Sequence, residues 1–462
     1  MPRRENREDE MEFETILKIV GSLLAKGEIS ALRSLLSELN VVDTAAIMEE
    51  LEPAERLRLF RVLPKDVSAD VFSYLETDSQ TELVGMINDK ELENLMGEMF
   101  LDDTVDFLEE MPANVVTRVL RNTDAETRKT INRFLRYPDN SAGSIMTIEM
   151  VQLRDDMTAA QAIASIRKNG IEKETVYTCY VTDSTHRLLG AVPLLSLLMC
   201  EDETLVRDIM QNDAQLISVN TLDDREEVAE IVKKYDLLSI PVVDNEDRLV
   251  GIITVDDIVD VIEEEATEDI EKMGSLAPSD DEYLKTGVFK LVRNRIFWLL
   301  VLLVTGTLAG VLIFLYNADG FVTDNIALIV SMPLIMGISG SAGSQSSTLM
   351  IRGLLVGEID TKDYFKIVFK EIRVAAVCAA VLGAVNLLRV FLPGTDGIEN
   401  CAVVSLAIFV SVIIAKLVGA SLPIIAKALK RDPATVGGPF IQSLSDIVSL
   451  AVYFGIACAI LG

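Results

Sequence analysis

Five long apolar stretches in the second half of the chain constrain its fold more than any other feature. Each is close to the length of about 20 residues that an α-helix needs to cross the hydrocarbon core of a bilayer. The bilayer core offers no partners for backbone N–H and C=O groups, so a spanning segment has to be a helix or part of a closed barrel. We therefore predict a transmembrane domain of five helices over residues 284–462. The stretches cover residues 296–315, 327–351, 374–392, 402–423 and 439–461.

Basic residues in the loops predict how the chain is oriented. Arg293 and Arg295 precede the first stretch, Arg352 follows the second, and Lys427 and Lys430 lie between the fourth and the fifth. The two remaining loops carry mainly acidic residues. Because cytoplasmic loops are enriched in Lys and Arg, we expect the N-terminal half in the cytoplasm and the C-terminus outside. This predicts a multi-pass protein of the cell membrane.

The acidic charge of the chain lies almost entirely before the membrane domain. Residues 1–283 carry 28 Lys and Arg against 62 Asp and Glu, whereas residues 284–462 carry 14 against 10. A surface this acidic repels polyanions, so we expect no nucleic acid among the partners of the soluble half. The excess favours bound cations. A solvated acidic surface without a specific ligand is the alternative.

Few residues suited to catalysis occur in the chain. Its one histidine, His186, lies among polar residues in a predicted turn, and its five cysteines form no CxxC pair. These counts exclude an HExxH metalloprotease, a zinc cluster and a disulfide framework. The sequence also contains no phosphate loop and no nucleophile elbow. We predict that the protein is not an enzyme.

The first part of the soluble half has a helical period. After an N-terminal segment of residues 1–28, residues 29–136 show apolar spacings of three and four, and several of the repeats close with a proline. This pattern is typical of short amphipathic helices. The polar positions are mostly acidic. We therefore predict an acidic, all-α N-terminal domain over residues 29–136.

The second part repeats itself and has a mixed character. Short β-branched runs alternate with helical ones, and the pattern recurs after about 60 residues, with Met146 matched by Met210 and Gly190 by Gly251. Each βαββα copy is too small to bury its own core, so the two copies should pack as a pair.

These two copies, residues 137–203 and 204–262, resemble a tandem of CBS domains. The resemblance implies an α/β regulatory module that often binds adenine nucleotides or ions. In such domains the string TVDD, Thr254 to Asp257, is where a ribose or a metal is held, so Thr254 and Asp257 are candidate nucleotide-binding residues. A purely structural dimerisation module is the alternative.

An acidic helix and a loop, residues 263–283, are predicted to connect the soluble half to the membrane domain. Glu265, Glu268 and Asp269 fall at positions i, i+3 and i+4, and therefore on one helix face. Three like charges on one face repel one another. The pattern favours either a bound cation or extended solvation.

A single acid, Asp446, lies in the middle of the fifth apolar stretch. A carboxylate at this depth costs about 3 kcal/mol on insertion scales, which indicates a proton relay, a structural hydrogen bond or a cation ligand. The second stretch is rich in Gly and Ser over residues 333–353 and offers carbonyl and hydroxyl oxygens as further ligands. The other ionisable residue well inside a stretch is Lys416. Its long side chain could reach the cytoplasmic face, so we interpret it as an interfacial anchor.

Four strings together show that the chain resembles the MgtE family of magnesium channels or transporters over nearly its full length. The resemblance implies a homodimer in the lipid bilayer, with one pore on its two-fold axis that the second and fifth helices line. It implies that Mg²⁺ is both transported and sensed, and it makes ATP a candidate ligand of the CBS pair. The strings are YPDNSAGSIMT at 137–147, EEEATEDIEKMG at 263–274, GSQSSTLMIRG at 343–353 and DPATVGGPFIQSLSDI at 432–447.

The resemblance also implies two sets of site residues. Asp446 of each subunit would bind a largely hydrated Mg²⁺, an ion that holds its waters tightly and prefers octahedral oxygen ligands. At high cytoplasmic concentration, Mg²⁺ would bridge the connecting helix to neighbouring domains and close the pore. The pore-lining residues would be Gly340, Gly343, Gln345, Gly438, Pro439 and Gln442. The regulatory ligands would be Glu265, Glu268, Asp269, Asp256, Asp257, Asp260, Asp102, Asp103, Asp106 and Asp432.

Two alternative functions stay open. Ser341 stands where members of the family often have Asn, so a broader transporter of Mn²⁺, Co²⁺ and Ni²⁺ is an alternative to a magnesium-selective one. A nucleotide-regulated anion channel with CBS domains is disfavoured, because Asp446 and the acidic soluble half would repel anions.

Overall fold

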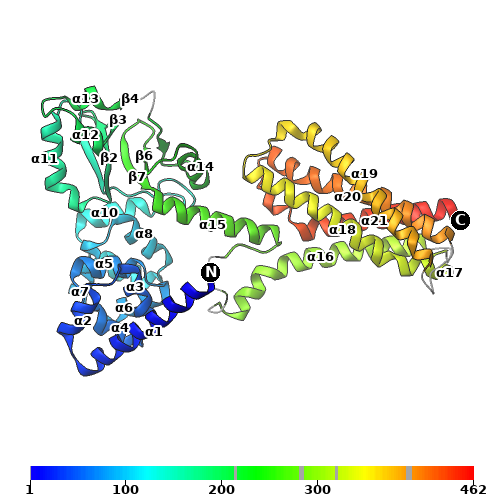
Figure 1. Ribbon diagram of the computed structural model, residues 1–462, viewed down its shortest axis with the longest axis horizontal. Helices are drawn as coiled ribbons and strands as arrows, with labels where there is room; N and C mark the ends of the chain where they lie inside the picture. Colours follow the sequence, from blue (N-terminus) through cyan, green and yellow to red (C-terminus); the bar gives the residue numbers. More distant parts are fainter. Residues whose placement is uncertain are drawn as a thin grey trace. The chain divides into compact units, whose positions relative to one another are not determined.

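The structure, a computed structural model, consists of two compact units. The first unit is residues 1–262 and the second is residues 263–462. Figure 1 shows the helices and strands of both. The residues that the structure describes are 2–212, 216–279, 283, 286–317, 321–391 and 398–461.

Ten helices form the N-terminal part of the first unit. Local capping helps to set their ends: Pro53 opens α4, and Asn88 accepts hydrogen bonds from the backbone N–H groups of Lys90 and Glu91 to cap α7. Helix α1 belongs to the same core, because its Val20 and Leu24 are buried there. The helices are α1 Pro2–Lys26, α2 Ile29–Leu36, α3 Val41–Glu49, α4 Pro53–Phe60, α5 Lys65–Ser73, α6 Thr77–Met86, α7 Asp89–Glu98, α8 Leu101–Glu110, α9 Ala113–Asn122 and α10 Ala125–Phe134.

Two small sheets follow, one for each sequence repeat. In both, a parallel pair of strands is joined by an antiparallel pair: β1 is parallel to β2 and β2 antiparallel to β3, while β5 is parallel to β6 and β6 antiparallel to β7. The strands are β1 Met150–Arg154, β2 Thr175–Thr182, β3 Leu188–Pro193, β4 Gln211–Asn212, β5 Val219–Asn220, β6 Ser239–Val243 and β7 Leu249–Thr254. The helices between them are α11 Ala159–Asn169, η1 Gly170–Glu172, α12 Leu194–Met199, α13 Val206–Ile209 and α14 Arg225–Tyr235.

The two repeats are interlocked through their matched residues. A Cβ on Gly190 of the first copy would lie 2.3 Å from the Gln211 carbonyl and 3.2 Å from the Met210 sulfur of the second copy. In the same way, a Cβ on Gly251 would lie 2.9 Å from the Met146 sulfur of the first copy. Each copy therefore supplies a glycine where the other brings its methionine, so neither copy completes its packing alone. This confirms the prediction that the copies pack as a pair.

One apolar core joins the N-terminal helices to the second repeat. It includes Phe72 and Phe107 from the helices and Val242 and Ile253 from β6 and β7. The side chains at the junction are therefore held by packing on both sides. Helix α8 and the start of α15, Val255–Met273, lie at this junction and position the acidic residues described below.

Helix α15, Val255–Met273, follows β7 directly, begins in the first unit and ends in the second. Within its described residues, the second unit also holds five helices that are long and apolar enough to cross a membrane. They are α16 Val288–Tyr316, α18 Ile326–Leu355, α19 Tyr364–Leu387, α20 Ile398–Ala428 and α21 Gly438–Leu461, with the short helix α17 Phe321–Asp324 before α18. The turns η2 Thr361–Asp363, η3 Leu388–Phe391 and η4 Pro433–Thr435 adjoin them.

All five helices overlap the predicted apolar stretches, and most extend beyond them, whereas α19 ends at Leu387, before the predicted end at residue 392. For example, α16 starts at Val288, before Arg293 and Arg295, and α20 continues to Ala428. Hydropathy marks only the part of a helix that faces lipid, whereas the backbone hydrogen bonds continue into the charged ends.

Helix α20 is the centre of the second unit. It packs against α18, α19 and α21. Its approach to α18 depends on glycine, since a Cβ on Gly419 would lie 2.1 Å from the carbonyl oxygen of Gly343. Large apolar side chains cover the outer faces of the bundle, among them Phe314 and Phe369, as expected of a surface that contacts lipid. The fold is therefore a multidomain membrane protein with an all-α domain, a pair of α/β repeats, a connecting helix and a five-helix bundle.

Candidate functional site

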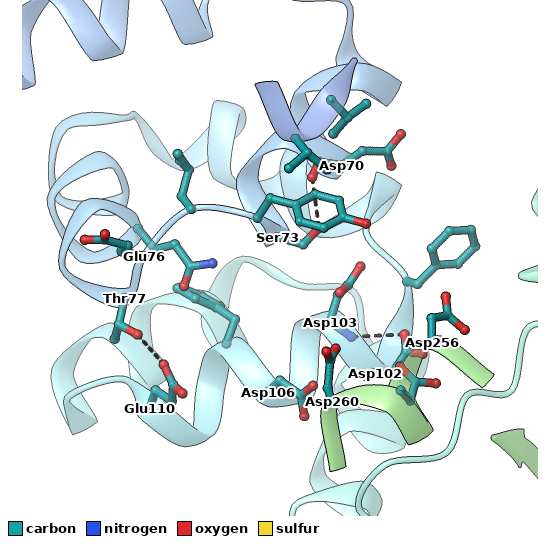
Figure 2. Close-up of a pocket in the computed structure, with 18 of the residues that line it drawn as sticks. Asp70, Ser73, Glu76, Thr77, Asp102, Asp103, Asp106, Glu110, Asp256 and Asp260 are labelled. Atoms are coloured by element: carbon teal, nitrogen blue, oxygen red, sulfur yellow. Dashed lines mark hydrogen bonds between the residues drawn. The ribbon is translucent and has the colours of Figure 1, made fainter. Parts of the chain in front are cut away.

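Two helix N-termini bring carboxylates into one cavity of the first unit, which we call the acidic pocket. Figure 2 shows aspartates from α8 and from the start of α15 pointing into the same space. The cavity has a volume of about 930 Å³. Its acidic lining residues are Asp43, Asp70, Glu76, Asp102, Asp103, Asp106, Glu110, Glu174, Asp256, Asp257 and Asp260. All six regulatory aspartates predicted in α8 and the second repeat therefore lie in one pocket.

The local sequence explains why these carboxylates are held where they are. Asp102 and Asp103 lie in the first turn of α8, and Asp256 and Asp257 lie in the first turn of α15. Acidic side chains are stabilised there by the partial positive charge of the helix N-terminus. Asp102 Oδ1 also accepts a hydrogen bond of 3.0 Å from the backbone N–H of Asp103.

The pocket nevertheless disfavours the ionised state of several of its acids. Burial, together with a smaller contribution from neighbouring aspartates, raises the pKa of Asp103 and of Asp257 to about 6. Asp102 is buried more deeply, and its pKa is raised well above the ordinary value. Like charges and desolvation both oppose ionisation, so a cation in the pocket would relieve both costs.

Among the described residues, no group of three or more His, Cys, Asp and Glu side chains is placed to hold a metal ion. The cavity of about 930 Å³ nevertheless has room for an ion that keeps its waters. Mg²⁺ is such an ion, since it usually binds through one or two carboxylates and several waters. The acidic lining attracts a hydrated cation of this kind.

Thr254 and Asp257, the candidate nucleotide residues, are hydrogen-bonded to each other. Thr254 Oγ1 donates to Asp257 Oδ2 at 2.7 Å, and Asp257 faces the acidic pocket. A phosphate group would be repelled there by the surrounding carboxylates. The geometry of Asp257 thus favours its assignment to a cation over its assignment to a nucleotide.

Five acids of the pocket were not predicted from the sequence: Asp43, Asp70, Glu76, Glu110 and Glu174. Glu174 immediately precedes β2, and its Oε2 atom is buried with no hydrogen-bond partner within the described part of the chain. Burial and the charges of Asp256 and Asp257 raise its pKa to about 7. Asp70 enters from α5. Neither Glu174 nor Asp70 belongs to an acidic run, so only the tertiary contact identifies them.

A second set of charges joins the end of α15 to the segment before α21. Lys272 Nζ lies 2.6 Å from Glu268 Oε1 and 2.8 Å from Asp432 Oδ2. Burial and the nearby Asp432 carboxylate raise the pKa of Asp269 to about 6. A Cβ on Gly437 would lie 2.6 Å from the Met273 carbonyl, so the two backbones are in close contact. Of the predicted α15 ligands, Glu268 and Asp269 therefore lie beside Asp432.

The predicted helix face of α15 is visible in the burial pattern. Glu265, Glu268 and Asp269 are partly buried, whereas Glu263 and Glu264 are exposed. The spacing i, i+3, i+4 thus identified the side of the helix that faces the protein.

Asp446 lies in the third turn of α21, where α18 approaches most closely. A Cβ on Gly340 would lie 2.8 Å from Asp446 Oδ1 and 2.6 Å from Gln442 Cγ, so only glycine leaves room for these side chains. The Asp446 Oδ1 atom is buried and has no hydrogen-bond partner within the described residues. A buried carboxylate oxygen without a protein donor is a candidate cation ligand.

The other predicted pore-lining residues are spread over the facing helices α18 and α21. Gly343 meets Ser445, and Gly438 meets Ser344, so both glycines allow the two helices to approach. Gln345 and Gln442 are exposed on the bundle surface, and Pro439 is partly buried in the first turn of α21.

The interpretation of Lys416 as an interfacial anchor is wrong. The residue is 6% exposed, and its Nζ donates to Ser346 Oγ at 3.3 Å and lies 4.0 Å from Glu371 Oε2. Glu371, 8% exposed, was overlooked because it lies just before the predicted third stretch. A signal was present, since Glu371 continues the four-residue spacing of the buried Ile367, Ala375 and Ala379.

Three family models match parts of the chain. The model of MgtE, described as a divalent cation transporter, matches residues 332–456. The MgtE intracellular N domain matches residues 39–140, and the CBS domain matches residues 206–264. These ranges cover most of α18 to α21, helices α3 to α10 and most of the second repeat.

Solved structures and curated proteins give the same result. The soluble part of a magnesium transporter is similar at 30% identity with a TM-score of 0.52, over 55% of this chain and 99% of that one. The cytosolic domain of the Mg²⁺ channel MgtE in complex with ATP is similar at 35% identity with a TM-score of 0.50, over 52% of this chain and 98% of that one.

Full-length relatives extend the match through the membrane helices. The magnesium transporter MgtE of Thermus thermophilus is 34% identical over 94% of this chain and 96% of the relative, and that of Bacillus subtilis is 33% identical over 96% and 97%. Identity at this level over both whole chains, together with the three domain matches, shows that the chain belongs to the MgtE family.

Proposed function

We propose that this protein transports Mg²⁺ across the cell membrane and that Mg²⁺ in the cytoplasm closes it. The observation that carries the transport function is Asp446, whose buried Oδ1 atom has no hydrogen-bond donor in the described structure and faces the glycines of α18. A carboxylate in this position attracts a cation, and the oxygen atoms around it suit a hydrated divalent ion. Full-length relatives named magnesium transporters support the choice of ion.

The regulatory part of the proposal depends on the two acidic sites outside the bundle. The acidic pocket gathers carboxylates whose pKa values are raised by burial and by one another, and Mg²⁺ would bind there by displacing protons. Asp269 and Asp432 form the second site, beside the first turns of α21. Mg²⁺ bound at both sites would hold α15 against the domains and close the pore.

Four further features belong to the same proposal. We infer a homodimer, in which Asp446 of the two subunits would meet on the axis, and a membrane orientation with the N-terminal domains in the cytoplasm. We infer that the CBS pair binds ATP outside the acidic pocket, because a similar cytosolic domain has been solved with ATP and the carboxylates around Asp257 would repel its phosphates. The domain limits 29–136, 137–203, 204–262 and 263–283 are part of this proposal.

Flux through the purified full-length chain in proteoliposomes tests the function directly. We expect Mg²⁺ to enter vesicles that contain the protein and the influx to stop when Mg²⁺ is raised on the side of the soluble domains. A fluorescent Mg²⁺ indicator inside the vesicles gives the rate. Equal rates for Mg²⁺, Mn²⁺, Co²⁺ and Ni²⁺ would favour the broader divalent transporter, and no influx above empty vesicles would reject the proposal.

The raised pKa values of the acidic pocket predict an unusual pH dependence of stability. The folded pKa values of Asp103, Asp257 and Glu174 lie at about 6 to 7, and the unfolded values lie near 4. The folded state therefore binds more protons than the unfolded state between about pH 4 and pH 7, so the free energy of unfolding falls as the pH rises through this window. Without Mg²⁺, we expect residues 1–262 to melt at a lower temperature at about pH 8 than at about pH 5.

Thermal unfolding followed by circular dichroism measures this effect. Saturating Mg²⁺ should raise the melting temperature mainly at the higher pH, because it replaces the lost protons. The double variant Asp103→Asn with Asp257→Asn should flatten both dependences. The control, Glu201→Gln with Asp202→Asn, removes the same charge from two exposed residues and should leave both dependences in place. Identical behaviour of the two double variants would argue against the pocket as the Mg²⁺ site.

A further inference from the structure

A series of three hydrogen-bonded side chains links α20, α18 and α19 inside the membrane bundle. It starts at Lys416 of α20, passes through Ser346 of α18 and ends at Glu371 of α19. Ser346 Oγ accepts from Lys416 Nζ at 3.3 Å and donates to Glu371 Oε2 at 2.9 Å. All three side chains are buried. The Ser346 hydroxyl therefore hydrogen-bonds to both charged groups at once. It belongs to α18, the helix that faces Asp446.

Stability alone gives a weak reason for such an arrangement. Two charges buried in a low-dielectric interior lose their hydration, and apolar residues of similar volume often fill the same space at no loss of stability. In a membrane helix, ionisable residues that face the bundle interior are by default assigned to function. The function of the three side chains has to follow from the helices that they hold in place.

The three residues lie close along the helices to the Asp446 site. Ser346 follows Gly343 by one helical turn, and Gly343 contacts Ser445, the neighbour of Asp446. Lys416 directly follows Ala415, whose carbonyl oxygen is 3.1 Å from the position of a Cβ on Gly343. A rotation or shift of α18 that breaks the Ser346 hydrogen bonds would therefore also move Gly340 and Gly343 against α21.

The three side chains also affect the electrostatics of the bundle interior. Lys416 places a positive charge inside the bundle that binds the transported cation. Glu371 cancels it, which leaves Asp446 as the uncompensated charge among the described residues in the interior of the apolar helices. Without Glu371, the ammonium group would repel a divalent cation twice as strongly as a monovalent one.

We propose that Lys416, Ser346 and Glu371 form a positioning triad that sets the register of α18 against α21 and neutralises the Lys416 charge for the cation at Asp446. The proposal rests on the Mg²⁺ transport proposed above. The three side chains act through α18 and through their charge, and they do not themselves bind the transported ion.

Flux assays on the full-length chain in proteoliposomes test the triad. The Glu371→Gln variant leaves the ammonium group uncompensated, and we expect it to lower maximal Mg²⁺ flux by about tenfold or more. Ser346→Ala removes only a hydroxyl, and we expect it to raise the half-saturating Mg²⁺ concentration and to change the ratio of Mg²⁺ to Co²⁺ flux. We expect both variants to give the same proportion of folded protein in detergent as the wild type. The flux of each variant is normalised to its amount of folded protein.

A charge exchange and a matched control separate positioning from general packing. The swap Glu371→Lys with Lys416→Glu rebuilds the pair with Ser346 still between the charges, so we expect it to recover most of the flux lost in Glu371→Gln. Asn386→Ala is the control, since Asn386 joins α19 to α20 by hydrogen bonds to Cys401 and Ser405 and is not a member of the triad. It should lower thermal stability but leave the half-saturating concentration and ion preference unchanged.

The outcomes are distinguishable from a failure of the proposed function. If the wild-type chain moves no Mg²⁺, the transport proposal fails and the triad falls with it. If the wild type transports Mg²⁺ but folded Ser346→Ala keeps its half-saturation and ion preference, and the charge swap stays well below the wild-type flux, the triad is overturned alone. If Glu371→Gln does not fold, Ser346→Ala and the swap still decide.

Discussion

Replacement of Asp446 by Asn is expected to lower Mg²⁺ flux through the full-length protein by about 100-fold or more. A carboxylate attracts a divalent ion held through one water by several kcal/mol at the effective dielectric constant of a protein interior, and the amide removes most of this attraction. In a homodimer the substitution removes both carboxylates at once. The rate of influx into proteoliposomes, normalised to incorporated protein, measures the effect.

In this structure, the substitution removes the negative charge with little change in packing. The Asp446 Oδ1 atom accepts no hydrogen bond from the described residues, so an isosteric amide breaks no hydrogen bond at this atom and should leave α18 and α21 packed as before. Glu399→Gln is the control, because Glu399 is an exposed acid at the start of α20. It should transport at the wild-type rate. Wild-type flux and ion preference in Asp446→Asn would remove Asp446 from the pathway.

The membrane helices could be predicted from the sequence because hydropathy reports directly on the environment of a spanning segment. Their ends could not, as α16 and α20 show, because the helical backbone continues past the apolar residues. The same limit explains the error at Lys416. Its distance from the cytoplasmic end allowed it to reach the interface, whereas its partner Glu371 lay outside the predicted stretch, where its four-residue spacing with buried apolar residues was overlooked.

The acidic pocket shows a different limit. The aspartates of α8 and of the second repeat were identified through family strings and acidic runs, and the structure brings them together. Glu174 and Asp70 stand alone in the sequence, each between residues of other kinds. Their role depends on a contact between an N-terminal helical domain and a β-α repeat, and no local pattern encodes such a contact. Periodicity places a residue on a face, but only packing decides what that face meets.

Removal of the negative charges from Glu268 and Asp269 is expected to keep Mg²⁺ flux intact and to abolish most of its inhibition by cytoplasmic Mg²⁺. Both residues lie beside Asp432, where α15 approaches the start of α21. In the structure, Lys272 neutralises part of this cluster by bridging Glu268 to Asp432, but the pKa of Asp269 is still raised to about 6. A bridging Mg²⁺ would need the carboxylates of both segments, so it should lose affinity when one side becomes neutral.

The double variant Glu268→Gln with Asp269→Asn should shift the Mg²⁺ concentration that halves the flux by about tenfold or more, and Glu265→Gln should add to the shift because it shares their face. Glu263→Gln with Glu264→Gln removes the same charge from the exposed side of α15 and should leave the inhibition near the wild-type concentration. Flux is measured at fixed external Mg²⁺ while Mg²⁺ is varied on the side of the soluble domains. Equal shifts in the two double variants would mean that the net charge of α15, rather than a bound ion at Asp432, controls closure.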